Sequence, residues 1–273
     1  MSTKLNFLNL GCGNKFHESW INVDMVPADS RVIQCNFLNG IPFDENRFEV
    51  VYHSHVLEHF SKNDGEIFIK ECYRILKPGG IIRIVLPNLE RIAKEYLINL
   101  ERAEGNEPGA EKDYDWILLE MYDQTVRNYS GGEMVDYLQN KNKINFDYVD
   151  SRIGWSEYLR VSEAFQKEEK TGVEKITLFN QSVKSKLQNI KYRILLSLLS
   201  ESDKVAIDIG RFRLGGEIHQ WMYDKYSLRR LLSHLGFQSI LIRTANESYI
   251  NNWASFHLDN PNETASLFIE GIK

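Results

Sequence analysis

The sequence has few of the residues that mark a secreted, membrane-spanning or disulfide-bonded protein. Its 273 residues contain only three cysteines, Cys12, Cys35 and Cys72, an odd number without the paired spacing of a zinc site. Free cysteines in apolar surroundings behave as small hydrophobic residues. The N-terminus has no apolar signal core, and the most apolar run, residues 194–199, is too short to cross a bilayer. We therefore predict a cytoplasmic protein without a membrane span.

An excess of basic charge is also lacking. The chain has 33 Lys and Arg against 38 Asp and Glu, a formal net charge of −5. Binding to a nucleic-acid backbone requires a basic face, so no nucleic-acid partner is predicted, although a local basic pocket stays compatible with this charge. An apolar content of 42% is ordinary for a globular protein, and the length suits one large α/β domain or a domain with an appendage.

Short apolar segments separated by turn and helix signals fill the first ninety residues. A helix is predicted from about Ser61 to Leu76, and Lys77-Pro78-Gly79-Gly80 is expected to end it. Apolar strands separated by helices are typical of a parallel sheet covered on both faces. The predicted strands are residues 7–10, 20–24, 31–36, 48–53 and 81–86.

The pattern changes after Pro87. From about Leu89 to Leu214 the chain carries Glu, Lys, Tyr and Leu at helical spacing, over a length too great for a loop. A helix at 226–235 and strands at 237–243 and 264–269 then resume the α/β pattern. We predict a core formed by residues 1–88 and 215–273, with residues 89–214 as a helical insertion that caps the substrate.

Two glycines and an acid stand at the ends of the first two predicted strands. Gly11 and Gly13 either form a simple tight turn or let the backbone approach a ligand, and Asp24 can accept hydrogen bonds from both ribose hydroxyls of a nucleoside. Parallel strands bring these ends together at the carboxyl edge of the sheet, where open α/β sheets bind ligands. A dinucleotide fingerprint requires glycine where Phe16 stands and an acid later than Asp24, which disfavours an NAD-dependent oxidoreductase.

A series of motifs identifies a family resemblance. The segments 8–13, 23–24, 41–51, 56–60 and 71–80 (LNLGCG, VD, IPFDENRFEVV, VLEHF and ECYRILKPGG) occur in this order and spacing. Together they resemble the class I S-adenosylmethionine (SAM)-dependent methyltransferases of the group called methyltransferase type 11. The resemblance covers residues 5–88 and resumes at 219–243, where 219–228 is similar to a subgroup from bacterial glycan and natural-product pathways.

The resemblance implies a Rossmann-like α/β fold with a seven-stranded, mostly parallel sheet, its last strand antiparallel, and the helical insertion before the last two strands. It implies SAM as the cofactor, with the glycines beside the methionine part and Asp24 at the ribose. Asn9 and Asn36 stand where the family usually has acids, and only residues 14–20 are left for the first helix, which must be abbreviated. The predicted cofactor-binding residues are Asn9, Gly11, Cys12, Gly13, Asp24, Met25, Asn36, Phe37, His53, Ser54 and His55.

Methylation of a hydroxyl or amine requires removal of a proton, a task that suits histidine near neutral pH. His55, His59 and His219 are the candidate catalytic residues, each with the alternative of a hydrogen-bonded structural histidine. Four residues are candidates for substrate binding, with packing or a solvated surface as the alternative: Arg211, Arg213, Trp221 and Tyr223.

The segment from His55 to His59 is similar to a Glu-x-x-Glu-His cluster with which some methyltransferases hold a divalent ion. Here His55 replaces the first acid, and the sequence offers no clear fourth ligand. No metal is therefore predicted.

The leading prediction is an enzyme that transfers a methyl group from SAM to an oxygen of a small bacterial metabolite, a saccharide or a peptide-derived or other natural product. Its partner would be a small-molecule, peptide or glycan acceptor. Methylation of nitrogen or a carboxylate is the alternative among enzymes, and a catalytically inactive SAM-binding partner protein is the alternative of another class. The oligomeric state is left open.

Overall fold

The computed structural model describes residues 6–140, 142, 144–154, 199–261 and 264–273. Its centre is a seven-stranded sheet in the order β3-β2-β1-β4-β5-β7-β6, in which β7 is antiparallel to both neighbours. This topology confirms the predicted fold class. The strands are β1 (Phe7–Leu10), β2 (Ile21–Asp24), β3 (Val32–Gln34), β4 (Phe48–Ser54), β5 (Leu76–Pro87), β6 (Gln238–Arg243) and β7 (Ser266–Ile272).

Two capped helices cover one face of the sheet. Ser61 accepts a hydrogen bond from Asp64 N at the start of α1 (Lys62–Ile75), and Asp224 does the same for Ser227 N at the start of α9 (Lys225–His234). The apolar faces of both helices join the buried strand residues in the largest hydrophobic core. Three short 3-10 helices complete this part of the chain: η1 (Phe37–Asn39), η2 (Leu57–His59) and η3 (Trp253–Phe256).

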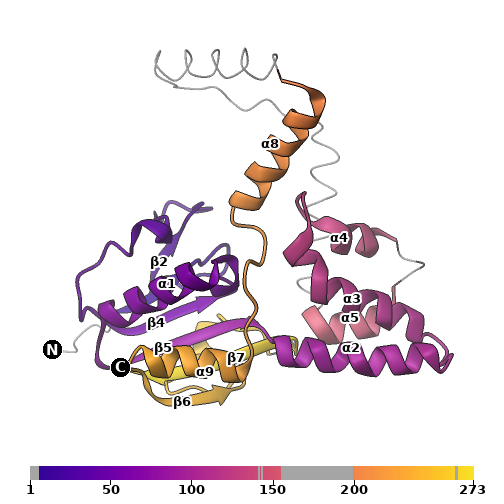
Figure 1. Cartoon of the computed structure of the whole chain (residues 1–273). Helices are drawn as coiled ribbons and strands as arrows, with labels where there is room; N and C mark the ends of the chain where they lie inside the picture. The colour runs from indigo at the N-terminus through magenta and orange to yellow at the C-terminus, as the bar shows by residue number, and fades with distance from the viewer. Residues whose placement is uncertain (1–5, 141, 143, 155–198, 262–263) are drawn as a thin grey trace.

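A helical insertion lies between β5 and β6. The described helices are α2 (Leu89–Glu104), α3 (Ala110–Val126), α4 (Gly132–Gln139), α5 (Phe146–Ile153) and α8 (Glu201–Leu214). Helices α2 to α5 pack to one side of the sheet around a small core of their own that includes Trp116 and Leu138 (Figure 1). Residues 155–198 of the predicted insertion lie outside the described residues.

The structure corrects three details of the sequence prediction. Residues 11–20 form turns rather than an abbreviated first helix. β5 already begins at Leu76, so the Lys77–Gly80 segment, which was expected only to end the helix, belongs to the strand. β7 runs from Ser266 to Ile272, whereas the sequence predicts a strand at 264–269. It is buried on both faces, because Leu267 and Ile269 point into the main core and Phe268 into the aromatic cluster on the opposite face.

An aromatic cluster covers the face of the sheet opposite α1 and α9, where residues 11–20 form turns in place of the predicted first helix. Trp20 lies against Phe7, Phe256 and Trp253, with ring centroids 5.0, 5.2 and 6.1 Å apart. Tyr52 contacts the same cluster at 5.2 Å from Trp253. Residues 245–258, from the C-terminal part of the chain, therefore bury this face.

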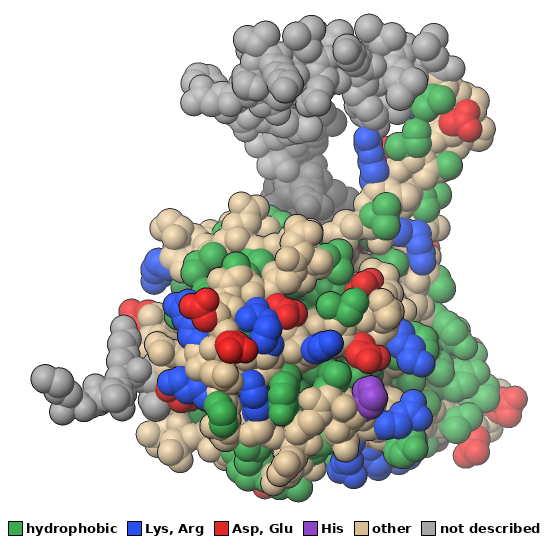
Figure 2. Space-filling view, turned by 60° about the vertical axis from the view of Figure 1, so that its left-hand side comes forward, with side chains coloured by type: hydrophobic (Ala, Val, Ile, Leu, Met, Phe, Trp, Pro, Cys, Tyr) green, Lys and Arg blue, Asp and Glu red, His purple; other side chains and the backbone are tan. Residues whose placement is uncertain are grey.

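Acidic and basic side chains are interspersed on the face of the molecule that Figure 2 shows. Such a mixture is typical of a solvated surface. Among the described residues, no helix combines the length and the apolar character that crossing a membrane requires.

Arg83, on β5, links the sheet to the C-terminal residues that form the aromatic cluster around Trp20. Its side chain is fully buried, and its guanidinium lies 2.5 Å from Asp259 and 2.8 Å from Glu270. It also donates to the carbonyl groups of Glu247 and Thr244, at 2.9 Å each. Because the side chains of Arg83, Asp259 and Glu270 are all buried, these charges depend on one another for partners.

Replacing this arginine tests that dependence. Arg83→Met would leave the buried Asp259 without its cationic partner and Glu270 with Arg243 alone, at 3.2 Å, and we expect a loss of about 3–5 kcal/mol in the free energy of unfolding, measured by urea denaturation. Arg31→Met, which removes an exposed arginine paired with Asp29 at 2.8 Å, is the matched control and should leave the unfolding midpoint almost unchanged. Equal midpoints for the two variants would contradict the assigned role of Arg83.

Candidate active site

The glycine turn and the acid lie together, at the carboxyl ends of β1 and β2. Gly11 and Gly13 have φ angles of +65° and +49°, a region that glycine enters without strain. The Asp24 carboxylate accepts hydrogen bonds from Gly13 N and Val26 N, both at 2.8 Å. The turn is therefore fixed to the end of the next strand, the arrangement that the sequence predicts.

A small cavity of about 180 Å³ opens beside this turn. An added Cβ at Gly13 would meet nothing within 4 Å, whereas one at Gly11 would collide with Val56. The open space at Gly13 and the left-handed turn fit the methionine part of SAM, which the turn backbone and Ser54 would hold. The lining residues are Asn9, Gly11, Cys12, Asn14, Lys15, Tyr52, Ser54, His55, Val85, Leu258, Asp259 and Asn260.

Two asparagines replace acids, and each makes a local hydrogen bond. Asn9 is buried, and its Nδ2 donates to Lys15 O at 3.1 Å, which orders the glycine turn without a charge. Asn36 Oδ1 accepts from Leu38 N at 3.0 Å and caps η1. Its carbonyl oxygen is thus already engaged at the position predicted to face adenine.

The remaining predicted cofactor residues take different environments. Met25 is exposed, and Phe37 is buried against Phe68, with ring centroids 5.5 Å apart. His53 is fully buried, no described residue forms a hydrogen bond with either of its ring nitrogens, and burial lowers its pKa to about 4. Burial, with Asp24 nearby, raises the pKa of the Cys12 thiol to about 11, so this cysteine is no thiolate nucleophile.

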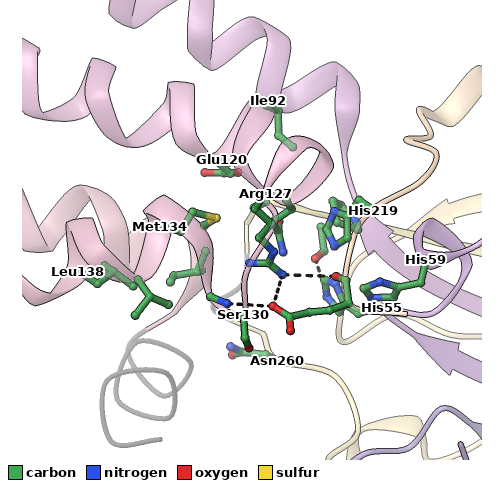
Figure 3. Close-up of a pocket in the computed structure, with 18 of the residues that line it drawn as sticks. His55, His59, Ile92, Glu120, Arg127, Ser130, Met134, Leu138, His219 and Asn260 are labelled. Carbon is green, nitrogen blue, oxygen red and sulfur yellow. Dashed lines mark hydrogen bonds and ion pairs between the residues drawn. The ribbon is translucent and has the colours of Figure 1, made fainter. Parts of the chain in front are cut away.

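A larger cavity of about 570 Å³ lies between the sheet edge and the insertion. Figure 3 shows the imidazoles of His55, His59 and His219 on one side and Met134 and Leu138 on the other. The cavity is therefore lined by imidazoles toward the core, and by both apolar and charged side chains toward the helices. Its further lining residues are Lys15, Pro87, Ile92, Glu120, Gln124, Arg127, Ser130, Gly131, Val135, Ile153, Glu217, Asn260, Ala265 and Ser266.

His55 belongs to the lining of both cavities. Its backbone is held at a φ of +53°, which is unusual for a residue other than glycine, and its N–H donates to Val85 O at 2.9 Å. Its Nδ1 lies 3.2 Å from Glu58 Oε1, and its Nε2 lies 3.4 Å from the Ser266 hydroxyl. A strained backbone that the surrounding structure enforces is typical of functional sites.

Glu58 is the buried centre of a cluster of imidazoles. Ligand atoms of Glu58, His59 and His219 all lie within 4.8 Å of one another. Burial opposes ionisation of this carboxyl, but the contact with His55 and the neighbouring His59 and His219 lower the pKa of Glu58 to about 2. Burial lowers the pKa of His219 to about 3, so its ring is neutral at physiological pH.

Backbone hydrogen bonds place His219 in this cluster. Gln220 N and Trp221 N both donate to the Glu58 carbonyl, at 2.7 and 3.2 Å, and His219 N donates to Gln124 O at 2.8 Å. These bonds fix the return segment, residues 215–224 between α8 and α9, against η2 and α3. The sequence predicts the three histidines as catalytic candidates and includes Glu58 only in the metal-like segment His55–His59, without a link to His219.

The predicted substrate-binding residues are dispersed. Arg211 is exposed on α8, and the Arg213 guanidinium donates to carbonyl groups at the end of α3, including Val126 O at 3.2 Å. Tyr223 is buried in the main core, whereas Trp221 is half-exposed with Lys62 Nζ 5.1 Å from its ring centre.

Other charged residues face the larger cavity instead. Arg127 pairs with Glu217 at 3.1 Å, and Glu120 forms a two-point ion pair with Arg152, at 2.6 and 3.1 Å. No motif in the sequence distinguishes these residues from the solvated charges around them, so only the fold could identify them.

Residues 8–84 match the sequence profile of a family described as "Methyltransferase domain". The matched range includes the glycine turn, Asp24 and η2. The chain contains a SAM-dependent methyltransferase domain. No functionally curated protein matches the sequence of this methyltransferase.

Several solved structures are similar to this methyltransferase at low sequence identity. A SAM-dependent methyltransferase from Archaeoglobus fulgidus is 11% identical over 98% of this chain and 86% of its own, with a TM-score of 0.38. A putative methyltransferase from Haloferax volcanii, in complex with the activator Trm112, is 9% identical over 100% and 84%, with a TM-score of 0.39. A possible histamine N-methyltransferase from Thermotoga maritima is 12% identical over 98% and 82%, with a TM-score of 0.39. At these TM-scores the resemblance says nothing about the acceptor.

Asp24 offers a direct test of the cofactor site of this methyltransferase. Asp24→Ala removes the predicted ribose acceptor and the partner of Gly13 N, and we expect SAM affinity to fall about 10- to 100-fold in isothermal titration. Asp29→Ala, an acid on the same loop paired only locally with Arg31, should bind SAM as the parent does. Unchanged affinity of Asp24→Ala, with circular dichroism spectra alike, would remove Asp24 from the cofactor site.

Proposed function

We propose that this methyltransferase transfers a methyl group to a hydroxyl oxygen of a small acceptor held in the larger cavity. The position of His55 supports this most directly, because it is the candidate base that lines both the cofactor cavity and the larger cavity. Transfer from a sulfonium is an in-line displacement, so the acceptor oxygen and the methyl group must meet where the two cavities join.

His55 is suited to remove the acceptor proton. With Nδ1 facing the buried carboxylate of Glu58 at 3.2 Å, Nε2 is the nitrogen directed toward Ser266 at the cavity wall. A carboxylate behind an imidazole fixes its orientation and stabilises the cation that forms when it accepts a proton. Bound SAM would supply the electrophilic methyl group, and the residues of the chain would align the acceptor, exclude water and accept the proton.

The lining of the larger cavity supports an acceptor of mixed character. Its core side presents imidazoles, and its helical side presents apolar residues such as Met134 and Leu138 together with the charged Glu120 and Arg127. A peptide-derived or other natural product can combine a hydroxyl group with an apolar body that suits Met134 and Leu138, whereas a saccharide would contact mainly the imidazoles and the charged side chains. The resemblance of residues 219–228 to a subgroup from bacterial glycan and natural-product pathways supports the same class.

Labelled SAM and a panel of hydroxyl, amine and carboxylic-acid acceptors test the proposal. We expect label in a hydroxylated acceptor, and His55→Ala should lower kcat about 100-fold or more. The same variant should keep SAM affinity within about threefold, because the proton is removed only during turnover.

His234→Ala is the control, since this histidine has a side chain that is 72% exposed on α9. It should leave kcat and SAM affinity as in the parent. Label found only in amines would exclude the hydroxyl acceptor, and a fully active His55→Ala variant would exclude His55 as the base.

A further inference from the structure

Glu58 is a buried charge without the donors that such a group normally has. It is 0% exposed, and among the described residues its nearest partner is the His55 imidazole, with no backbone N–H, lysine or arginine bound to either carboxylate oxygen. An ionised carboxylate removed from water costs several kcal/mol unless it is paired or coordinates a cation. The 3.2 Å ion pair with His55 engages Oε1, and no described residue forms a hydrogen bond with Oε2.

Two further imidazoles face the same point. His59 Nδ1 donates to Ile218 O at 3.1 Å, and this bond leaves Nε2 with its lone pair available. His219 is 5% exposed, and its ring centroid lies 4.9 Å from that of His59 at an interplanar angle of 76°. A histidine that binds a metal through one ring nitrogen usually donates the N–H of the other to a carboxylate, a backbone carbonyl or water, and this bond fixes the orientation of the ring.

We propose that Glu58, His59 and His219 bind one divalent transition-metal ion at the floor of the larger cavity. Their candidate ligand atoms lie within 4.8 Å of one another, and an ion with bonds of about 2.1 Å requires ligand atoms no more than about 4.2 Å apart. Movements of a few tenths of an ångström in these side chains complete the site. His219 supplies the ligand that the sequence did not reveal, because it lies 160 residues beyond His59.

The donor set selects the class of ion. Two imidazole nitrogens and one carboxylate suit Zn²⁺ and its neighbours Co²⁺, Fe²⁺ and Mn²⁺, whereas Ca²⁺ and Mg²⁺ are held by oxygen ligands. Among the described residues, this is the only group of three such side chains close enough to hold a metal. Three protein ligands leave an open coordination position, as catalytic sites require.

The role of the ion rests on the proposed function. His59 and His219 line the larger cavity, so the open position faces the acceptor. A hydroxyl oxygen bound there would have its pKa lowered, and its proton would pass to His55 Nε2 at the same cavity wall. The ion changes no oxidation state and gives up no electrons in this step.

Titration of the chelator-treated full chain with Co²⁺ tests the site without any acceptor. We expect one Co²⁺ per chain, visible d–d absorption and displacement by Zn²⁺. Glu58→Gln, His59→Ala and His219→Ala should each weaken Co²⁺ binding more than about tenfold, since removing a direct ligand costs at least as much as removing its outer support. His234→Ala, which removes an exposed imidazole, should bind Co²⁺ as the parent does.

Isothermal titration with SAM is run on the same preparations. Absence of Co²⁺ binding, or equal Co²⁺ affinity in His219→Ala and the parent, overturns the metal site; the proposed hydroxyl methylation still stands if metal-free enzyme methylates a hydroxylated acceptor. Co²⁺ binding that depends on the three ligands supports the site even where no hydroxylated acceptor is labelled, a result that overturns the proposed function alone. The circular dichroism spectrum of each variant must match that of the parent, and Glu58→Gln, which keeps the side-chain volume, is the variant that least disturbs the fold.

Discussion

The arrangement of the site depends on the hydrogen bonds that Gln220 N and Trp221 N donate to the Glu58 carbonyl. These two bonds join η2, which belongs to the first third of the chain, to the segment that returns from the insertion. Because η2 directly follows β4, these bonds hold the return segment beside the carboxyl end of that strand. The cofactor cavity and the larger cavity have a wall in common there. His55 lies in that wall.

The protein satisfies most of its buried charges with matched partners. Arg83 is surrounded by two carboxylates and several carbonyl groups, and Arg152 pairs with Glu120 inside the insertion. Glu58 differs from both, because its neighbours are imidazoles rather than a guanidinium. An imidazole can be neutral, protonated or bound to a metal, so the charge next to Glu58 can change. A guanidinium stays protonated, so the charge next to Asp259 and Glu120 is fixed.

Much of the sheet and the glycine turn could be predicted from the sequence, since apolar runs, the turn glycines and the acid at position 24 are local signals. The turns at residues 11–20 could not, because their stability comes from aromatic contacts with residues more than 200 positions away. The segment His55–His59 and His219 could each be singled out from the sequence, but their proximity could not be predicted, because it depends on backbone hydrogen bonds between residues about 160 positions apart. Tyr223 shows the opposite case, in which an aromatic residue beside a motif belongs to the core.

The replacement of a first helix by turns has a consequence for the order in which the protein is assembled. The aromatic layer over Trp20 is completed by Trp253 and Phe256, and Leu258, Asp259 and Asn260 form a wall of the cofactor cavity opposite Gly11. The cofactor pocket therefore joins the beginning and the end of the chain. During synthesis on the ribosome the first ninety residues emerge long before their covering layer exists, so the nascent chain must keep an apolar sheet face unburied until the last segment arrives.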